Sequence, residues 1–271
     1  MPVEWPTGTD VVTVALHDRV AVITLNRPER RNALHHEMHA PITRALQEFA
    51  ERDDVGCIVL TGAGAAFCAG GDVKGDGSDW SAFDDDARAA RLTADAQIAR
   101  LLHEHSKLTM AAVNGPAVGA GLALALACDL RLATASARFV TGWARFAFSG
   151  DYGGAWFLTR LVGPSRALEL LATNASVTAD EALALGLVNR VAPDAQFDAA
   201  WRAWAAELAA GPTRAIAAMK ANVRDAVELS LADALPREAE RMVASRGTAE
   251  HREAVRAWKD GRSPVFPPPA P

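Results

Sequence analysis

The sequence predicts an α/β fold in which strand and helix units fill the first half of the chain and helices fill the second. Short β-branched and apolar runs at residues 11–16, 20–25, 57–61 and 108–113 are typical of strands. After residue 152 such runs nearly vanish, with 187–191 as the exception, and apolar residues recur at helical spacing. No low-complexity linker separates the halves. We therefore expect a catalytic core over residues 1–200 and a helical region over 201–271.

The individual elements follow from turns and periodicity. The first two runs are split by His17-Asp18-Arg19 and predict a hairpin, and a turn-rich segment at 26–34 precedes a helix that continues to about residue 52. A glycine-rich loop at 62–71 leads into an acidic stretch, 76–86, that predicts a mobile segment, either a lid or a disordered loop. Further strands are expected at 130–134 and 138–141. Helices are expected at about 87–106, 119–128, 154–172, 178–185, 195–210, 212–226 and 229–258.

Composition excludes several classes of function. The chain has 271 residues, 23% of them charged, and a net charge of −5, with no basic stripe for nucleic acid. No apolar run is long enough to span a membrane and no leader pattern is present, so we expect a cytoplasmic protein. Three widely spaced cysteines without a CxxC motif predict buried thiols, Cys68 included, rather than disulfides or a zinc site.

A site for a developing negative charge is predicted at Gly119-Ala120-Gly121, which opens a helix. A dinucleotide fingerprint is excluded because Leu124 occupies the position that needs a small residue. The first amides of a helix lack intrahelical partners, and the helix dipole favours an anion beside them. Two such N–H groups stabilise the oxygen of a reacting carbonyl, and small neighbours let the backbone approach it.

The histidines and serines give weaker signals. His35 and His39 stand four apart, but HExxH would need a histidine at position 40, where the chain has alanine, so we expect a solvated helix face and no metal site. His103 and His105 are predicted to lie on the surface. No G-x-S-x-G elbow supports a serine hydrolase.

Several motifs together, in order and at matching spacing, resemble the crotonase, or enoyl-CoA hydratase/isomerase, family. The resemblance covers nearly the whole chain apart from its ends. The motifs are Asn26-Arg27-Pro28, Asn32-Ala33-Leu34, Phe67-Cys68-Ala69-Gly70-Gly71-Asp72, Ala112-Val113-Asn114-Gly115, Cys128-Asp129, Gly153-Gly154, Leu161-Val162-Gly163 and Gly186-Leu187-Val188.

This resemblance implies a crotonase-like spiral of ββα units with a C-terminal helical trimerisation region, assembled as a homotrimer or a dimer of trimers. It implies an acyl-CoA thioester as substrate, with no cofactor beyond the coenzyme A that the substrate carries. By position, Gly71 and Ala120 supply the oxyanion-hole amides. The residues implied to border or bind the substrate are Arg27, Arg30, Ala33, Ala69, Asp72 and Trp143, and Lys259 or Arg262 is implied to reach the coenzyme A of a neighbouring subunit.

The chain departs from the family's hydratases at both of their catalytic glutamates. Those positions correspond to Ala123 and Trp143, neither of which transfers a proton. Asp151 instead occupies the position where the family's isomerases and its aryl-CoA dehalogenase carry an aspartate. An apolar setting from Trp143, Phe146 and Phe148 is expected to raise the pKa of its carboxyl toward neutrality.

The resemblance therefore favours enoyl-CoA double-bond isomerisation with Asp151 as the proton shuttle. Trp143 with Asp151 also resembles the dehalogenase pair, but the position of the dehalogenase's histidine corresponds to Ala96. Three alternatives stay open: hydration by a non-standard route, dehalogenase-like hydrolysis at Asp151, and acyl-CoA binding without catalysis. Asp151 is also a candidate helix N-cap. Trp80 and Phe83 are among the aromatic residues that hint at a bulky acyl group.

Overall fold

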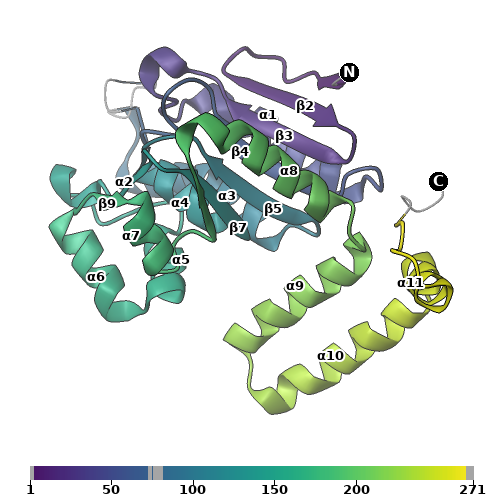
Figure 1. The fold of residues 1–271 in the computed structure, drawn as a ribbon. Helices are drawn as coiled ribbons and strands as arrows, with labels where there is room; N and C mark the ends of the chain where they lie inside the picture. The colour runs from purple at the N-terminus through teal and green to yellow at the C-terminus, as the bar shows by residue number, and fades with distance from the viewer. Residues whose placement is uncertain (1–2, 73–74, 76–81, 267–271) are drawn as a thin grey trace.

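A computed structural model describes residues 3–72, 75 and 82–266. An α/β core carries a helical C-terminal region, as the sequence predicts (Figure 1). Most of the predicted lid, residues 76–81, and Trp80 with it lie outside the described residues. The rest of that stretch is not a loop throughout, because Asp84 accepts a hydrogen bond from the Ala87 N–H and caps helix α2 (Asp85–Asp95).

A seven-stranded sheet with the order β1-β2-β3-β4-β5-β7-β10 forms the centre of the core. The first three strands are antiparallel, which confirms the predicted hairpin, and the strands from β3 onward are parallel. The last strand begins three residues later than predicted. The strands are β1 (Val3–Trp5), β2 (Val12–His17), β3 (Val20–Leu25), β4 (Cys57–Gly62), β5 (Leu108–Val113), β7 (Leu130–Thr134) and β10 (Arg190–Ala192).

Both faces of the sheet are buried, as runs of apolar residues in parallel strands require. Alternate residues of β4 belong to different cores. Ile58 and Leu60 pack in the larger core, which includes residues of α1 (His36–Glu51), α3 (Gln97–Glu104) and α4 (Ala120–Ala127). Val59 packs in the smaller core with Trp201 of α8 (Phe197–Ala209), the helix that crosses the other face in Figure 1.

Three helices predicted as continuous are each broken in two. Gly163, with φ of 78°, ends α5 (Gly154–Val162), and Pro164 begins α6 (Pro164–Thr173), a position where a missing N–H costs nothing. The predicted helix at 87–106 divides into α2 and α3 at Ala96. The predicted helix at 229–258 divides at Gly247 into α10 (Leu231–Arg246) and α11 (Ala249–Asp260).

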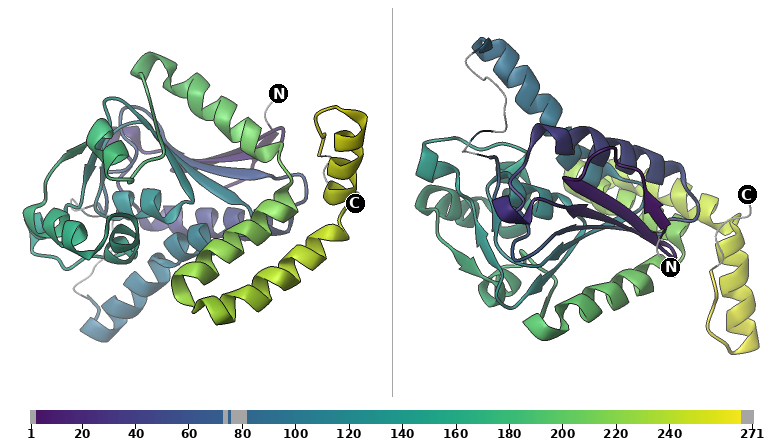
Figure 2. Two further views of the ribbon diagram at one scale, coloured as in Figure 1. Left: turned by 60° about the horizontal axis from the view of Figure 1, so that its bottom comes forward. Right: turned by 90° about the horizontal axis from the view of Figure 1, so that it is seen from above.

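The last helices form an arm. Helix α9 (Thr213–Glu228) and α10 pack against each other as a hairpin that projects from the core, and α11 follows at the open end of the hairpin, turned across the direction of α10 (Figure 2). Many large apolar side chains of the arm are exposed. Among the described residues, no helix has the length and apolar character that crossing a membrane requires.

Two glycine-containing loops are packed backbone against backbone at the edge of the larger core. In the first loop the carbonyl of Cys68 accepts a hydrogen bond of 2.9 Å from the N–H of Val118 in the second, beside the short strand β6 (Ala117–Val118) that the sequence analysis missed. A Cβ atom on Gly70, whose φ is 91°, would lie 2.9 Å from the carbonyl oxygen of Val118. A Cβ atom on Gly121 would lie 2.4 Å from the carbonyl oxygen of Cys68. Only glycine allows this contact.

Adjacent glycines in the first loop offer a matched test of this packing. We expect Gly70→Ala to lower the free energy of unfolding by about 2–4 kcal/mol, because it combines left-handed backbone strain with an overpacked contact. Gly71→Ala is expected to change it by less than about 0.5 kcal/mol, because Gly71 has no atom within 4 Å of its Cβ position and no positive φ. Urea denaturation of both variants measures the difference, and equal losses would show that the contact between the loops is not the constraint.

Candidate active site

Two backbone N–H groups meet where the glycine loops touch. Ala120 is the first residue of α4, and the Cβ position of Gly70 lies 3.6 Å from its nitrogen. Gly71 follows directly, with open space at its own Cβ position. Within the described residues, neither the Gly71 nor the Ala120 N–H has a hydrogen-bond acceptor. Helix α4 is buried over its whole length, so its N-terminal dipole acts with little screening by water. The arrangement suits an oxygen atom that gains negative charge.

A carboxylate is held beside this helix terminus by an indole. The Trp143 Nε1–H donates a hydrogen bond of 2.9 Å to Oδ1 of Asp151. The ring of Trp143 is 6% exposed and lies against Gly154, where a Cβ atom would come within 2.2 Å of it. The Cβ position of Gly119, the residue before α4, is 4.0 Å from the same indole nitrogen. Trp143 therefore links the Asp151 carboxyl to the start of α4.

The pKa of the Asp151 carboxyl is raised above its ordinary value. Burial is the larger cause, because it disfavours the charged form, and the hydrogen bond from Trp143 opposes the shift by stabilising the carboxylate. The direction agrees with the sequence analysis, and buried Trp143 lies against the carboxyl as expected, but the two phenylalanines do not. Phe146 and Phe148 stack on each other with 52% and 64% of their surfaces exposed, so they do not enclose the carboxyl. The interpretation of Asp151 as a side-chain helix cap is wrong, because Gly153 precedes α5 and no side chain caps it.

Neither hydratase position offers a carboxyl group. Ala123 is fully buried in α4, one turn after Ala120, and Trp143 fills the other position. Asp151 is thus the carboxylate nearest along the chain to the indole and the one bonded to it.

The loop before α1 is braced against the first glycine loop by an ion pair. The Arg27 guanidinium lies 3.0 Å from the Asp72 carboxylate and donates a second hydrogen bond to the Ala33 carbonyl. The side chains of Arg27 and Asp72 are only 12% and 4% exposed. Ala69 joins the same loops through its N–H, and Arg30 lies exposed on the short 3-10 helix η1 (Pro28–Arg30). Of Arg27 and Arg30, the two arginines that the resemblance implies lie beside the substrate, Arg30 is therefore the exposed one.

Two exposed cations, Lys259 and Arg262, lie near the C-terminus. Arg262 lies 2.7 Å from Glu253, in an ion pair at the end of α11. Lys259 is exposed on α11. The reach of either side chain into a neighbouring subunit stays a prediction.

The histidine predictions were wrong in two places. His105 is 6% exposed rather than on the surface, and its Nε2 lies 2.8 Å from the Leu46 carbonyl oxygen. Burial lowers the pKa of this imidazole. His39 is not on a solvated face, because its Nε2 lies 2.6 Å from the hydroxyl of Tyr152, the residue that follows Asp151. The only hint of this contact in the sequence was that the single tyrosine directly follows the candidate acid, Asp151.

One group of side chains has the spacing for a metal ion. Within the described residues, potential ligand atoms of His35, His36 and Glu37 lie within 4.8 Å of one another at the start of α1. His35 also serves as the N-cap of that helix, accepting from the Glu37 N–H. Two of the three residues are exposed, and helix capping accounts for the position of His35.

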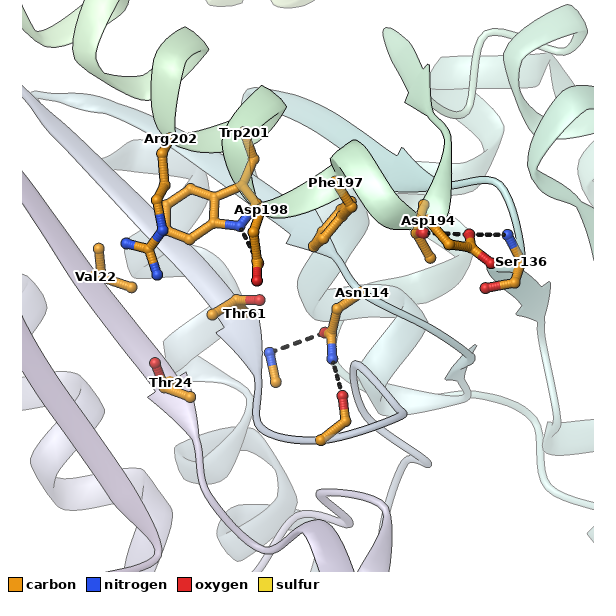
Figure 3. A pocket seen from close by; sticks show the side chains of 13 residues that line it. Val22, Thr24, Thr61, Asn114, Ser136, Asp194, Phe197, Asp198, Trp201 and Arg202 are labelled. Carbon is orange, nitrogen blue, oxygen red and sulfur yellow. Dashed lines mark hydrogen bonds between the residues drawn. The ribbon is translucent and has the colours of Figure 1, made fainter.

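A hollow of about 440 Å³ lies on the opposite face of the sheet, beneath α8 (Figure 3). Several of its polar side chains form hydrogen bonds within the protein. Asp194 accepts from the Thr134 hydroxyl and the Ser136 N–H, and Asp198 accepts from the Trp201 indole. This hollow is separate from the Trp143 and Asp151 pair, which belongs to the other core.

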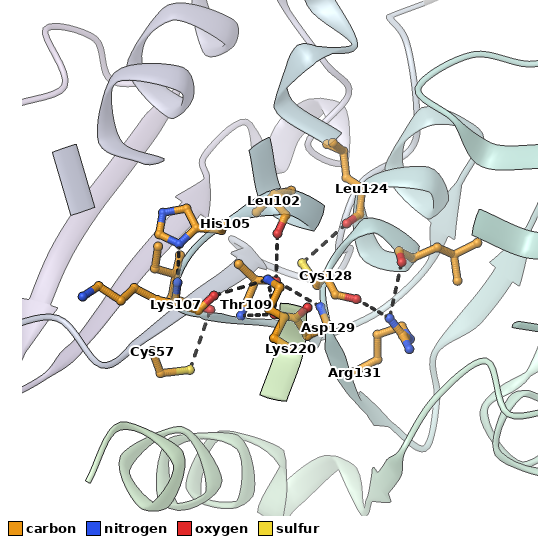
Figure 4. Close-up of polar contacts among 12 residues, drawn as sticks. Cys57, Leu102, His105, Lys107, Thr109, Leu124, Cys128, Asp129, Arg131 and Lys220 are labelled. Carbon is orange, nitrogen blue, oxygen red and sulfur yellow. Dashed lines mark hydrogen bonds and ion pairs between the residues drawn. The ribbon is translucent and has the colours of Figure 1, made fainter. Parts of the chain in front are cut away.

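A buried polar cluster occupies the far end of α4 and ties the arm to the core (Figure 4). Lys220 of α9 lies 2.7 Å from the carboxylate of Asp129, which also accepts from the Thr109 N–H and hydroxyl. Burial lowers the pKa of the Lys220 ammonium, and Asp129 opposes that shift. The eight residues of α4 separate this cluster from Ala120 by about 12 Å. The cluster therefore anchors α9 and does not contact the candidate active site.

The three thiols are buried, as predicted. Cys57, Cys68 and Cys128 are free, and burial raises the pKa of each to about 12. Cys68 lies under the first glycine loop, against Gly121. None of the three has the depressed pKa of a nucleophilic cysteine.

Comparison with known proteins identifies relatives that align with nearly the whole chain. A protein named "Probable enoyl-CoA hydratase" from Rhodobacter capsulatus is 37% identical over 93% of this chain and 95% of its own length. The 4-chlorobenzoyl coenzyme A dehalogenase-1 of Arthrobacter sp is 35% identical over 92% and 90% of the two chains. The 1,2-epoxyphenylacetyl-CoA isomerase of Escherichia coli is 33% identical over 91% and 94%.

The fold leads to the same group of proteins. A crystal structure of an enoyl-CoA hydratase from Polaromonas sp. JS666 superposes with a TM-score of 0.89 over 94% of this chain and 99% of that one, at 30% identity. The family model described as enoyl-CoA hydratase/isomerase matches residues 16–268. The chain belongs to the enoyl-CoA hydratase/isomerase family and has the crotonase fold.

Proposed function

We propose that the protein is an enoyl-CoA isomerase that moves a double bond by carrying a proton on Asp151. The observation that carries the proposal is the Trp143–Asp151 hydrogen bond beside the start of α4, with burial raising the pKa of the carboxyl. An acid and base for carbon works best when its pKa lies near the working pH, and burial moves Asp151 in that direction. The proposed substrate is an acyl-CoA thioester, with no separate cofactor.

The chemistry needs one carboxyl and two N–H donors. The Asp151 carboxylate removes a proton from one carbon of the acyl chain, and the electrons move onto the thioester oxygen to give an enolate. The N–H groups of Gly71 and Ala120 stabilise that oxygen. The same carboxyl then returns the proton to a second carbon, so the double bond has moved and Asp151 is regenerated.

Hydration by the family's two-glutamate route lacks its proton-transfer groups here, because Ala123 and Trp143 occupy the positions of the two glutamates. The name of the Rhodobacter capsulatus relative keeps hydration as an outcome to be measured.

A second candidate is dehalogenase-like hydrolysis, supported by the same indole-to-carboxylate hydrogen bond and by the relative named 4-chlorobenzoyl coenzyme A dehalogenase-1. There the Asp151 carboxylate attacks the halogenated carbon, halide leaves, and water hydrolyses the resulting ester. We rank it second because Ala96 stands at the position of the dehalogenase's histidine.

The proposed assembly is a homotrimer or a dimer of trimers formed through the C-terminal arm. The arm exposes many large apolar side chains in the single chain, and exposed apolar patches mark interaction surfaces. They are Met219, Val223, Val227, Leu231, Leu235, Met242, Val243 and Trp258. Sedimentation equilibrium is expected to give three or six times the mass of 28.7 kDa. A monomer at micromolar concentration would contradict the assembly.

The reaction is tested by incubating the protein with short, medium and aromatic enoyl-CoAs in D₂O and following products by mass spectrometry. We expect double-bond migration with deuterium incorporation into the acyl chain. Asp151→Asn is expected to lower the rate by about 10²–10⁴-fold, because proton transfer by a positioned side chain contributes about that factor. Asp180→Asn, a matched change at an exposed carboxyl, is expected to leave the rate unchanged.

The alternative functions predict other results, measured in the same assay with 4-chlorobenzoyl-CoA as a further substrate. Hydration that survives Asp151→Asn would contradict the isomerase and favour a non-standard hydratase. Halide release from 4-chlorobenzoyl-CoA would favour hydrolysis at Asp151. Tight coenzyme A binding without turnover would favour a binding protein.

The raised pKa of Asp151 also predicts a pH-dependent cost in stability. A folded-state pKa above the unfolded value of 3.8 contributes stability that is complete below that value and is lost as the pH rises through the folded pKa. Asparagine does not titrate. The free energy of unfolding of Asp151→Asn, relative to wild type, is therefore expected to increase from about pH 4 upward and then level off. Urea denaturation from about pH 3 to pH 8 measures it, and a difference that stays constant across that whole range would contradict the raised pKa.

A further inference from the structure

The residue after Asp151 has a backbone conformation that large side chains seldom adopt. Tyr152 has φ of 50°, between Gly150 at 118° and Gly153 at 73°. A non-glycine residue stays in the left-handed region only where surrounding contacts hold it there. Because Asp151 and Tyr152 share a peptide bond, the contacts that hold Tyr152 also determine where the backbone of Asp151 lies.

Those contacts come from a helix more than a hundred residues earlier in the chain. The ring of Tyr152 is 6% exposed, and its hydroxyl lies 2.6 Å from Nε2 of His39 on α1. The short distance and the burial of the ring make this a well-defined anchor.

The partners of the other ring nitrogen indicate the direction of that hydrogen bond. Nδ1 of His39 lies 3.3 Å from the carbonyl oxygen of His36 and 4.0 Å from the carboxylate of Asp95, and both are acceptors. Asp95, at the end of α2, also lies 3.9 Å from Arg91. A neutral imidazole with its proton on Nδ1 accepts at Nε2 from the Tyr152 hydroxyl. His39 thus connects α1, the end of α2 and the segment that carries Asp151.

We infer that His39 is a positioning residue for Asp151 and acts through the Tyr152 hydroxyl. The inference rests on the proposed role of Asp151. Trp143 holds one carboxylate oxygen, and the His39–Tyr152 hydrogen bond holds the backbone on the other side of the same residue. Placement of the carboxyl over the reacting carbons then depends on two separate anchors, and a displacement of about 1 Å can cost about 100-fold in rate.

The variants remove or restore that single hydrogen bond. His39→Leu and Tyr152→Phe are each expected to lower kcat for double-bond migration by about tenfold and to change KM by less than about threefold, because the coenzyme A contacts are untouched. His39→Gln supplies an amide oxygen as acceptor and is expected to recover most of kcat. The double variant is expected to lose no more than either single variant. His17→Leu, at the end of the β2–β3 hairpin, is the matched control.

A spectroscopic readout reports the anchor directly. Tyr152 is the only tyrosine in the chain, so protein labelled with 3-fluorotyrosine gives one ¹⁹F signal. His39→Leu is expected to shift that signal, and His39→Gln is expected to return it toward the wild-type position. A signal away from the random-coil position also shows that the His39 variants are folded, and a cooperative urea transition shows it for Tyr152→Phe, which has no tyrosine.

The outcomes separate the inference from the function on which it rests. Wild-type kcat in His39→Leu with a shifted ¹⁹F signal, or additive losses in the double variant, would overturn the positioning role while Asp151→Asn remains inactive. Full activity of Asp151→Asn in the same assay would overturn the proposed function, and with it the role of His39.

Discussion

The candidate site depends on a contact between two backbones that leaves no room for a side chain. At Gly70 and at Gly121 a Cβ atom would enter the facing carbonyl group. The hydrogen bond between Val118 and Cys68 holds the loops at that separation. Since the Gly71 N–H follows one contact and the Ala120 N–H precedes the other, the spacing of the two donors is fixed by the core and needs no side chain to arrange it.

The position of the Asp151 carboxyl is determined differently. Asp151 comes from a later segment and is linked to the start of α4 through the indole of Trp143, which packs on Gly154 and bonds its carboxylate. Burial makes the charged carboxylate less favourable there, and the hydrogen bond recovers part of that cost. Holding this carboxyl in a buried position therefore costs stability and raises its pKa, which is the property that the proposed proton transfer requires. Helix α9 is fastened to the other end of α4 through Lys220, so the arm and the site share one buried helix.

The sequence predicted the features that local chemistry dictates. Apolar runs located the main strands, and glycine motifs located the loops, because both depend on residues close in the chain. It failed where distant residues decide. The hydrogen bond between His39 and Tyr152 joins residues 113 apart, and the spacing of apolar residues along the chain does not predict such a contact. Phe146 and Phe148 looked suited to enclosing Asp151, but burial of an aromatic residue depends on tertiary packing. Helix breaks at Ala96 and Gly163 were missed because apolar spacing continues across them.

The buried thiols give the molecule three internal reporters of opening. Alkylating reagents react with the thiolate, and both burial and a pKa of about 12 keep the three cysteines protonated and shielded at neutral pH. Cys68 lies beneath the glycine loops, Cys57 in β4 and Cys128 at the end of α4. When alkylation is faster than reclosing, the rate at which each cysteine-containing peptide gains mass is the rate at which its own region opens, so the loops, the sheet and the buried helix can be timed separately in one sample.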